Sequence, residues 1–170
     1  MIDAQGYRLN IGIVLANADG KLFWGRRSSG GKEGWQFPQG GMCAYETLEE
    51  AMYRELAEET GLSTSDVRVL KITSRWLYYQ IPPNSRHKPV IDSHGNIKKC
   101  IGQRQRWFLL QLLTDSKQIR FDTTDHPEFV DWRWVDYWYP LQHIVSFKQK
   151  VYAQVLREFE PLLFSTNSAE

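Results

Sequence analysis

The sequence has few cysteines, almost no net charge and no long apolar run. Only two of its 170 residues are cysteine, Cys43 and Cys100, and their spacing matches no metal-binding pattern, so we expect free thiols. No apolar stretch approaches the roughly 18 residues that a membrane helix requires. Residues 1–6 lack the basic and then apolar order of a secretory signal. These absences argue against membrane and secreted proteins and predict a cytoplasmic one.

Aromatic residues, in contrast, are plentiful and fit one folded domain. The chain has 7 Trp, 8 Tyr and 8 Phe, and 42% of its residues are hydrophobic, which is enough apolar side chain to fill a core. Its length predicts a single domain. We expect that domain to cover residues 1–163 and to be followed by a disordered tail over residues 164–170.

A helix is predicted to begin at residue 47 and to end near residue 61. Thr47 followed three residues later by Glu50 matches a capping box. Gly61 stands where a glycine in the left-handed conformation would end the helix. Apolar residues recur on the face that we expect to pack inward: Leu48, Ala51, Met52, Leu56 and Leu62.

Three glutamates of this helix form a predicted site for a divalent metal ion. Glu55 lies three residues before Glu58 and four before Glu59, so the three carboxylates share one patch of a helix surface. Like charges this close repel one another. Hard cations such as Mg2+ or Mn2+ prefer carboxylate oxygens as ligands. The alternative is a solvated acidic helix face.

A glycine-rich segment precedes the helix. Residues 35–41 predict a strand that runs into a loop ending in Gly40 and Gly41, where the backbone can approach a ligand closely. The order along the chain is therefore strand, loop and acidic helix.

The spacing of these residues resembles the Nudix box. Gly40 is followed by five residues and Glu46, and after seven more residues by Arg54-Glu55-Leu56-Ala57-Glu58-Glu59-Thr60-Gly61-Leu62. Every fixed position of the box is matched without a gap. The chain thus resembles the Nudix hydrolases, and further matches resemble the bacterial RNA pyrophosphohydrolases, whose relatives hydrolyse dinucleoside polyphosphates. Those matches are Gly6-Tyr7-Arg8 with Asn10, residues 35–41, 51–56, 101–103 and 107–110, Pro127-Glu128-Phe129, residues 132–135 and Ser146-Phe147-Lys148.

The resemblance implies a fold and a set of roles around the metal. The fold is the Nudix α/β/α sandwich, with a mixed sheet between helices. Glu128 becomes a further metal ligand or the catalytic base, whereas from sequence alone it would be a surface acid. Glu46 and Arg54 become a supporting ion pair. A backbone carbonyl near Gly40 also reaches the metal. We expect Mg2+ or Mn2+, and more than one ion when substrate is bound.

Substrate contacts are implied less directly. The resemblance places a 5′ base stacked on Phe147, with Arg8 and Lys148 nearby and Arg27 on phosphate. The alternative for Phe147 is helix packing. Three further residues could contact phosphate or nucleotide, or could form cross-strand surface pairs instead. The full set of candidate substrate-binding residues is Arg8, Arg27, Tyr79, Arg104, Arg106, Phe147 and Lys148.

The net charge of +1 conceals two oppositely charged regions. Residues 46–59 contain six acids and one arginine, a local balance of −5, whereas residues 86–106 contain six bases and one acid, a balance of +5. A substrate with several phosphates would bridge them, with metal on the acidic helix and cations on the remaining oxygens. The alternative for the basic segment is a solvated loop.

The other predicted elements alternate between strands and a second helix. We expect strands at residues 8–16, 21–26, 107–113 and 129–135, and one long or two shorter strands at residues 67–81. A turn is expected at residues 17–20 and a polar excursion from Pro82 to about Lys99. Ser146 and Gln149 match a second capping box, and the helix that follows should stop at Pro161.

These observations predict a metal-dependent enzyme that acts on phosphoric anhydrides. Our first hypothesis is an RNA 5′ pyrophosphohydrolase, which converts 5′-triphosphate or diphosphate ends to 5′-monophosphate ends and initiates mRNA decay. The second is asymmetric hydrolysis of dinucleoside polyphosphates of the Ap4A or Ap5A type, and the third is an inactive nucleotide-binding regulator. We expect no membrane or DNA partner. The sequence leaves open the preferred 5′ base, the general base, the oligomeric state and any protein activator.

Overall fold

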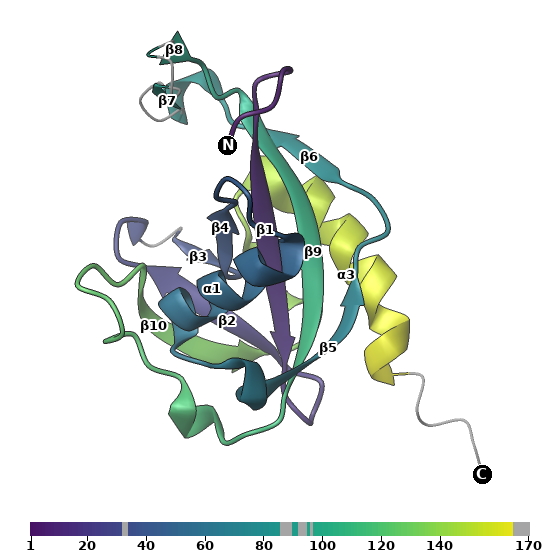
Figure 1. Ribbon diagram of the computed structural model, residues 1–170. Coiled ribbons are helices and arrows are strands. Elements are labelled where there is room, and N and C mark those ends of the chain that lie inside the picture. The colour runs from purple at the N-terminus through teal and green to yellow at the C-terminus, as the bar shows by residue number, and fades with distance from the viewer. Residues whose placement is uncertain (32–33, 86–89, 92–94, 96, 165–170) are drawn as a thin grey trace.

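A mixed sheet of eight strands forms the middle layer of the protein. The structure is a computed structural model, and it describes residues 1–31, 34–85, 90–91, 95 and 97–164. One long helix, α1 (Leu48–Thr60), crosses the near face of the sheet in Figure 1, and a second, α3 (Gln149–Phe164), covers the opposite face. This is the α/β/α sandwich that was predicted.

Five strands run across the sheet in the order β10-β2-β1-β9-β5, with β3 beside β2, β4 beside β1 and β6 beside β9. Their bounds are β1 Tyr7–Ala16, β2 Leu22–Arg27, β3 Trp35–Gln36, β4 Gln39–Gly41, β5 Val67–Ile72, β6 Leu77–Gln80, β9 Gly102–Leu112 and β10 Phe129–Val135. A separate pair is formed by β7 (Val90–Ile91) and β8 (Ile97–Lys98), and a short helix α2 covers Tyr139–His143.

The central strands β1 and β9 pair in parallel over ten residues each, from Tyr7 opposite Gly102 to Ala16 opposite Gln111. The other strand pairs of this sheet are antiparallel. Because side chains alternate along a strand, β1 and β9 supply apolar residues to both faces of the sheet. This explains why the later parts of both strands, residues 11–16 and 107–110, are continuous apolar runs.

Two apolar cores lie on the two faces. On the α3 side, Trp24, Phe37 and Trp107 are fully buried against helix residues such as Tyr152. On the α1 side, the buried residues come from β1, β2, β9 and the inner face of α1: Ile11, Ile13, Leu15, Phe23, Ala51, Met52, Leu56, Phe108 and Leu110. Each helix is therefore fixed to the sheet by its own apolar stripe.

The helix signals read from the sequence are confirmed for α1. Thr47 caps the helix: its side chain accepts a hydrogen bond from the Glu50 backbone N–H, and the Glu50 carboxylate accepts one from the Thr47 backbone N–H. Gly61 ends the helix at φ 71°, in the left-handed region that favours glycine. Of the expected apolar face, Leu48 is partly buried and the other four residues are fully buried.

Three local predictions were wrong. The glycine-rich loop is a short strand, because residues 39–41 pair with β1. The second capping box does not form: a 3-10 turn at Ser146–Lys148 continues directly into α3, and no side chain caps it. Pro161 lies inside α3. It removes only one backbone hydrogen bond, and the last turn is held where the Phe164 ring packs edge-on against Tyr137, with 5.3 Å between centroids.

The remaining expectations agree with the structure where it describes them. Residues 67–81 form two strands rather than one, and residues 107–113 belong to a strand that begins earlier, at Gly102. Cys43 and Cys100 are free thiols. Most of the expected polar excursion, between residues 86 and 96, lies outside the described residues. Of the tail expected at residues 164–170, Phe164 is instead the last residue of α3, and residues 165–170 lie outside the described residues. None of the helices described is long and apolar enough to cross a membrane.

Candidate active site

Helix α1 buries two of its three clustered glutamates. Only 7% of Glu55 and 3% of Glu59 is exposed, whereas the Glu58 side chain is 49% exposed. The i,i+4 spacing turns Glu55 and Glu59 toward the sheet, beside the short strand β4, while Glu58 lies at the rim. The alternative of a solvated acidic face is therefore wrong for Glu55 and Glu59. Buried carboxylates need a compensating partner.

Arg54 bonds to two glutamates of this cluster and to the backbone of β4. Its Nε donates to Glu46 Oε1 at 2.7 Å, and its Nη2 donates to Glu46 Oε2 at 3.0 Å and to the Gly41 carbonyl at 2.9 Å. The predicted ion pair between Glu46 and Arg54 is thus present. The same guanidinium also reaches Glu55, with Nη1 2.6 Å from Oε1. Arg54 fixes β4, the loop at Glu46 and the helix in one rigid unit.

Gly40 allows the close approach of β4 to Glu55. It pairs with Ile11 of β1, and a Cβ atom placed on Gly40 would lie 1.8 Å from Glu55 Cδ. Any side chain at this position would therefore displace the carboxylate. The glycine predicted to lie at the metal site contacts one of the predicted ligands directly.

Within the cluster, Glu59 is the carboxyl group whose surroundings most disfavour its charged form. One carboxylate oxygen, Oε2, accepts a hydrogen bond from the Gln39 backbone N–H at 3.1 Å, while Oε1 is buried without a partner among the described residues. Burial raises the pKa of Glu59 well above its usual value, and the nearby charges of Glu128 and Glu55 raise it further. Burial also raises the pKa of Glu55, against the opposing effect of Arg54. A bound cation would relieve this repulsion.

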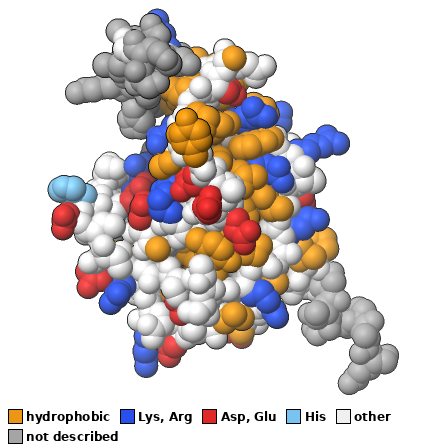
Figure 2. Space-filling model, in the orientation of Figure 1, with side chains coloured by type: hydrophobic (Ala, Val, Ile, Leu, Met, Phe, Trp, Pro, Cys, Tyr) orange, Lys and Arg blue, Asp and Glu red, His pale blue; other side chains and the backbone are white. Residues whose placement is uncertain are grey.

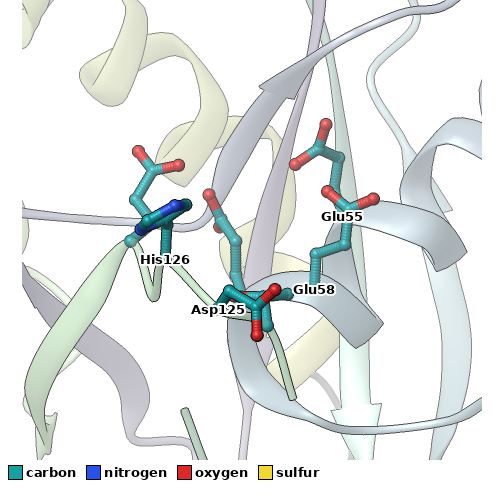
Figure 3. A pocket seen from close by; sticks show the side chains of 7 residues that line it. Glu55, Glu58, Asp125 and His126 are labelled. Atoms are coloured by element: carbon teal, nitrogen blue, oxygen red, sulfur yellow. The ribbon is translucent and has the colours of Figure 1, made fainter. Parts of the chain in front are cut away.

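The four predicted metal ligands line one pocket of about 350 Å³ (Figure 3). Glu128 reaches it from the loop before β10, where its carboxylate lies 3.1 Å from Arg27 Nε. The loop also contributes residues that the sequence did not suggest, Asp125 and His126, which face α1 across the pocket. Their only sequence signal was a polar run directly before Pro127-Glu128-Phe129.

The donors of this pocket fit a hard divalent cation. They are carboxylate oxygens, one of them buried and unpaired, on a backbone that approaches without a side chain at Gly40. Among the residues described, no three acidic, histidine or cysteine side chains are already gathered closely enough to hold an ion. Glu55 is instead turned toward Arg54. Ion binding would thus draw Glu55 away from a partner that it already has.

A chain of buried polar groups leads from the sheet to Lys148. The Trp107 indole N–H donates to Gln105 Oε1 at 3.1 Å, so the Gln105 amide nitrogen faces Asn10 at 2.7 Å and Gln39 Oε1 at 3.4 Å. Gln39 Oε1 is also 3.4 Å from Lys148 Nζ, which donates to a second amide oxygen, that of Gln36, at 3.0 Å. Every amide in this chain therefore presents its oxygen to the next donor.

Lys148 is consequently a buried cation whose hydrogen-bond partners in the described residues are neutral amides. Only 7% of it is exposed. Its pKa is lowered from 10.5 to about 8, mainly by burial and also by the charge of Arg27, while Glu128 and Glu59 oppose the shift. Gln39 joins the two halves of the site, because its backbone N–H holds Glu59 and its side chain holds Lys148.

Phe147 and Tyr79 lie beside this lysine. Their ring centroids are 5.8 Å apart, and Lys148 Nζ is 5.6 Å from the Tyr79 ring centre. Tyr79 is buried, which raises its pKa to about 12. Arg8 lies over Gly41, where an added Cβ would be 2.4 Å from its Nη2. Five of the seven candidate substrate-binding residues thus form one group beside β4, which meets the glutamates through the Arg27–Glu128 pair: Arg8, Arg27, Tyr79, Phe147 and Lys148.

Arg104 and Arg106 do not join this group. Their side chains alternate with Gln105 along β9, so they lie on the α1 face of the sheet, where both stack on Trp76. Arg104 also pairs with Asp3 at 3.6 Å. These two candidate substrate contacts therefore lie on the other face of the sheet from Phe147 and Lys148.

Comparisons with known proteins identify the family of this chain. The NUDIX domain model matches residues 6–159. The chain is 50% identical over 167 residues to the RNA pyrophosphohydrolase of Alkalilimnicola ehrlichii, covering 96% of this chain and 86% of that protein. It is 49% identical over 165 residues to the RNA pyrophosphohydrolase of Pseudomonas aeruginosa, covering 97% of this chain and 99% of that protein.

Solved structures share the fold at lower identity. The Escherichia coli dihydroneopterin triphosphate pyrophosphohydrolase superposes with a TM-score of 0.67 and 19% identity, covering 89% of this chain and 98% of that one. A Caenorhabditis elegans Ap4A hydrolase complex gives 0.62 and 16%, with 93% and 98% covered. At these identities the likeness establishes the fold alone. From the match of its sequence, box and architecture, the chain belongs to the NUDIX family of hydrolases.

Proposed function

We propose that this protein is an RNA 5′ pyrophosphohydrolase, which uses water to convert a 5′-triphosphate end to a 5′-monophosphate end and releases pyrophosphate. The observation that carries the proposal is the pairing of two features at one site. A pocket lined by four glutamates lies next to a buried ammonium group, Lys148, whose hydrogen-bond partners are neutral. The identity of about one half to relatives named RNA pyrophosphohydrolase supports it.

The residues that would hold Mg2+ or Mn2+ are Glu55, Glu58, Glu59 and Glu128, with the Gly40 carbonyl as a further candidate ligand. When bound, one or more such ions would neutralise phosphate oxygens and lower the pKa of a coordinated water. Burial and the neighbouring acids raise the pKa of Glu55 and of Glu59, and a bound cation would offset this by stabilising both carboxylates. The Gln39 N–H keeps one Glu59 oxygen fixed and leaves the other available.

The cations of the site would bind the phosphate chain. Lys148 stays largely protonated below pH 8, and because two amide oxygens hold it, its charge remains available to a phosphate or to an electron-rich base edge. Arg27 pairs with Glu128 at 3.1 Å and is placed to exchange this partner for a phosphate oxygen. Glu128, at the pocket rim, would then be free to act as a further ligand or to accept a proton from water.

The base at the 5′ end would stack on Phe147. The ring is partly buried and rests on the core at Tyr79, so one face has a firm support. Stacking of this kind contributes roughly 1 to 3 kcal/mol with little sequence preference. In this proposal the reaction takes place in the cytoplasm, and neither DNA nor a membrane is a partner.

One comparison of substrates tests the proposal. The specificity constant kcat/KM would be measured on a 5′-triphosphorylated oligonucleotide and on diadenosine tetraphosphate with the same metal ion, with Glu59→Gln as the inactive control. We expect a higher kcat/KM on RNA, a 5′-monophosphate product and release of pyrophosphate. A higher kcat/KM on diadenosine tetraphosphate would identify a dinucleoside polyphosphate hydrolase instead.

A further inference from the structure

Arginine and aromatic side chains are interleaved on the α1 face of strands β6 and β9. The Arg104 guanidinium lies 4.7 Å from the Trp76 ring centre and 5.6 Å from that of Tyr78, and Arg106 lies 5.9 Å from Trp76. Tyr78 packs edge-on against Tyr7, with 5.1 Å between centroids. We call these five residues the arginine–aromatic surface. In Figure 2, blue and orange atoms lie side by side over this part of the sheet.

This surface is partly exposed to solvent and carries more positive than negative charge. Tyr78 is 42% exposed, and Trp76, Arg104 and Arg106 are partly exposed. Asp3 pairs with Arg104, but only at 3.6 Å. The Nε atoms of Arg104 and Arg106 are buried without a hydrogen-bond partner among the described residues, so a phosphate on this surface would contact the outer Nη atoms. Within the part of the chain that the structure describes, Asp3 is the carboxylate that pairs with these two guanidinium groups, and positive charge remains.

The surface lies close to the glutamate pocket but outside it. Arg106 is opposite Ile11 in β1, and Ile11 is opposite Gly40 in β4. Neighbouring strands are separated by about 4.8 Å, which places the Arg106 backbone about 10 Å from that of Gly40. Paired residues share a face of the sheet, so Arg106 and Arg104 lie on the same side as α1 and Glu55. A chain leaving the pocket would meet this surface along β9.

We propose that the arginine–aromatic surface binds the single-stranded RNA chain downstream of its 5′ end. Bases would stack on the exposed face of Tyr78 and on the edge of Trp76, and the phosphates between them would pair with Arg104 and Arg106. Aromatic rings interleaved with cations are the features by which proteins hold single strands without reading their sequence. The proposal rests on the RNA activity proposed above and explains why two arginines predicted to contact substrate lie outside the pocket.

Binding of a fluorescent oligouridylate with a 5′-hydroxyl end tests this surface directly. The probe has no phosphate chain for the glutamate pocket, so its affinity does not depend on catalysis. We expect the double variant Arg104→Gln/Arg106→Gln to bind it more weakly, with a salt dependence that is flatter by about 1.4 log units per log unit of salt, since each phosphate contact contributes about 0.7. Tyr78→Ser should weaken binding on the order of tenfold and leave the salt slope unchanged.

Arg68→Gln is the matched control. Arg68 is exposed, bonds to Gln111 in β9 and lies on the opposite face of the sheet, so we expect its removal to change neither affinity nor slope. For hydrolysis, the double variant should lose more kcat/KM on a triphosphorylated oligonucleotide than on a triphosphorylated dinucleotide. If the double variant does not fold, Tyr78→Ser, which changes a half-exposed ring, decides the question.

Two results would overturn the proposal. Unchanged oligouridylate affinity in both the double variant and Tyr78→Ser would show that RNA does not touch this surface. An equal change of salt slope in Arg68→Gln would show that overall charge, and not this surface, attracts the probe. Neither result concerns hydrolysis of the 5′ end, so failure here is distinct from a failure of the proposed function, which the comparison with diadenosine tetraphosphate decides.

Discussion

The burial of a charged Lys148 predicts a specific dependence of stability on pH. The unfolded chain binds the lysine proton with a pKa near 10.5, whereas the folded protein binds it with a pKa of about 8. Between these two values the unfolded state holds more protons, so the free energy of unfolding rises with pH. At 1.36 kcal/mol for each pH unit, the full rise is about 3 kcal/mol. Below pH 8 this stability is absent, because the folded protein holds the buried charge.

Lys148→Met removes this contribution while keeping a side chain of similar length. The variant also loses the hydrogen bonds to Gln36 and Gln39, but their loss does not depend on pH in this range and cancels in a comparison of two pH values. Relative to Lys148→Met, the wild-type protein should therefore become more stable by about 3 kcal/mol between pH 7 and pH 10.5.

Urea denaturation of both proteins at pH 7 and pH 10.5, with a chelator present, measures how the stability difference between wild type and Lys148→Met changes with pH. Every other titrating group is common to both proteins and cancels. Lys150→Met, a change at an exposed lysine two residues further on, should show no such pH dependence. If the stability difference between wild type and Lys148→Met stays constant from pH 7 to pH 10.5, the ammonium group is solvated and the polar chain from Trp107 does not bury it.

Three further predictions concern the metal and the base. Without metal, Glu59→Gln should keep or raise the melting temperature, because it removes a buried repelling charge. The variant should lose most of the stabilisation by Mg2+, and its kcat should fall by orders of magnitude. A melting temperature that Mg2+ raises as much as in the wild type would contradict this. Gly40→Ala should displace Glu55 and so remove the rise in melting temperature that Mg2+ causes. Gly41→Ala, whose added methyl group meets only the end of the flexible Arg8 side chain, should keep that rise. Calorimetry with and without Mg2+ distinguishes the two variants. Phe147→Ala should raise KM for RNA by a factor equivalent to roughly 1 to 3 kcal/mol, whereas a large loss of stability with unchanged KM would assign the ring to the core.

Local signals in the sequence were sufficient for the acidic helix. Thr47, Glu50 and Gly61 act within one or two turns of their own positions, so their caps could be predicted and are present. The spacing of Glu55 and Glu59 likewise predicted a shared patch. Their burial could not be read from it, since burial depends on β4, which pairs with a strand about 30 residues away in sequence.

Tertiary contacts explain what the sequence did not reveal. The burial of Lys148 had no local signal, because its partners are the amides of Gln36 and Gln39, which only the fold brings to it. Gln105 in turn donates to Gln39. Arg104 can be assigned to a face of the sheet only if it belongs to a strand, and the sequence suggested that this strand starts at residue 107 rather than at Gly102. Pro161 is tolerated because Phe164 packs on Tyr137, a contact without any local signal.

Most of the chain must be synthesised on the ribosome before the two central strands of the sheet can pair. β1 is made first, yet its parallel partner β9 ends only at Leu112, and joining them closes a long loop before any of their contacts form. Helix α1 emerges between them and has only part of its sheet to pack on. The loop at Glu128 and Lys148 follow later still. A nascent chain should therefore be unable to hydrolyse nucleotides until almost its whole length has emerged. Chains that end before α3 should be inactive and should be degraded by proteases.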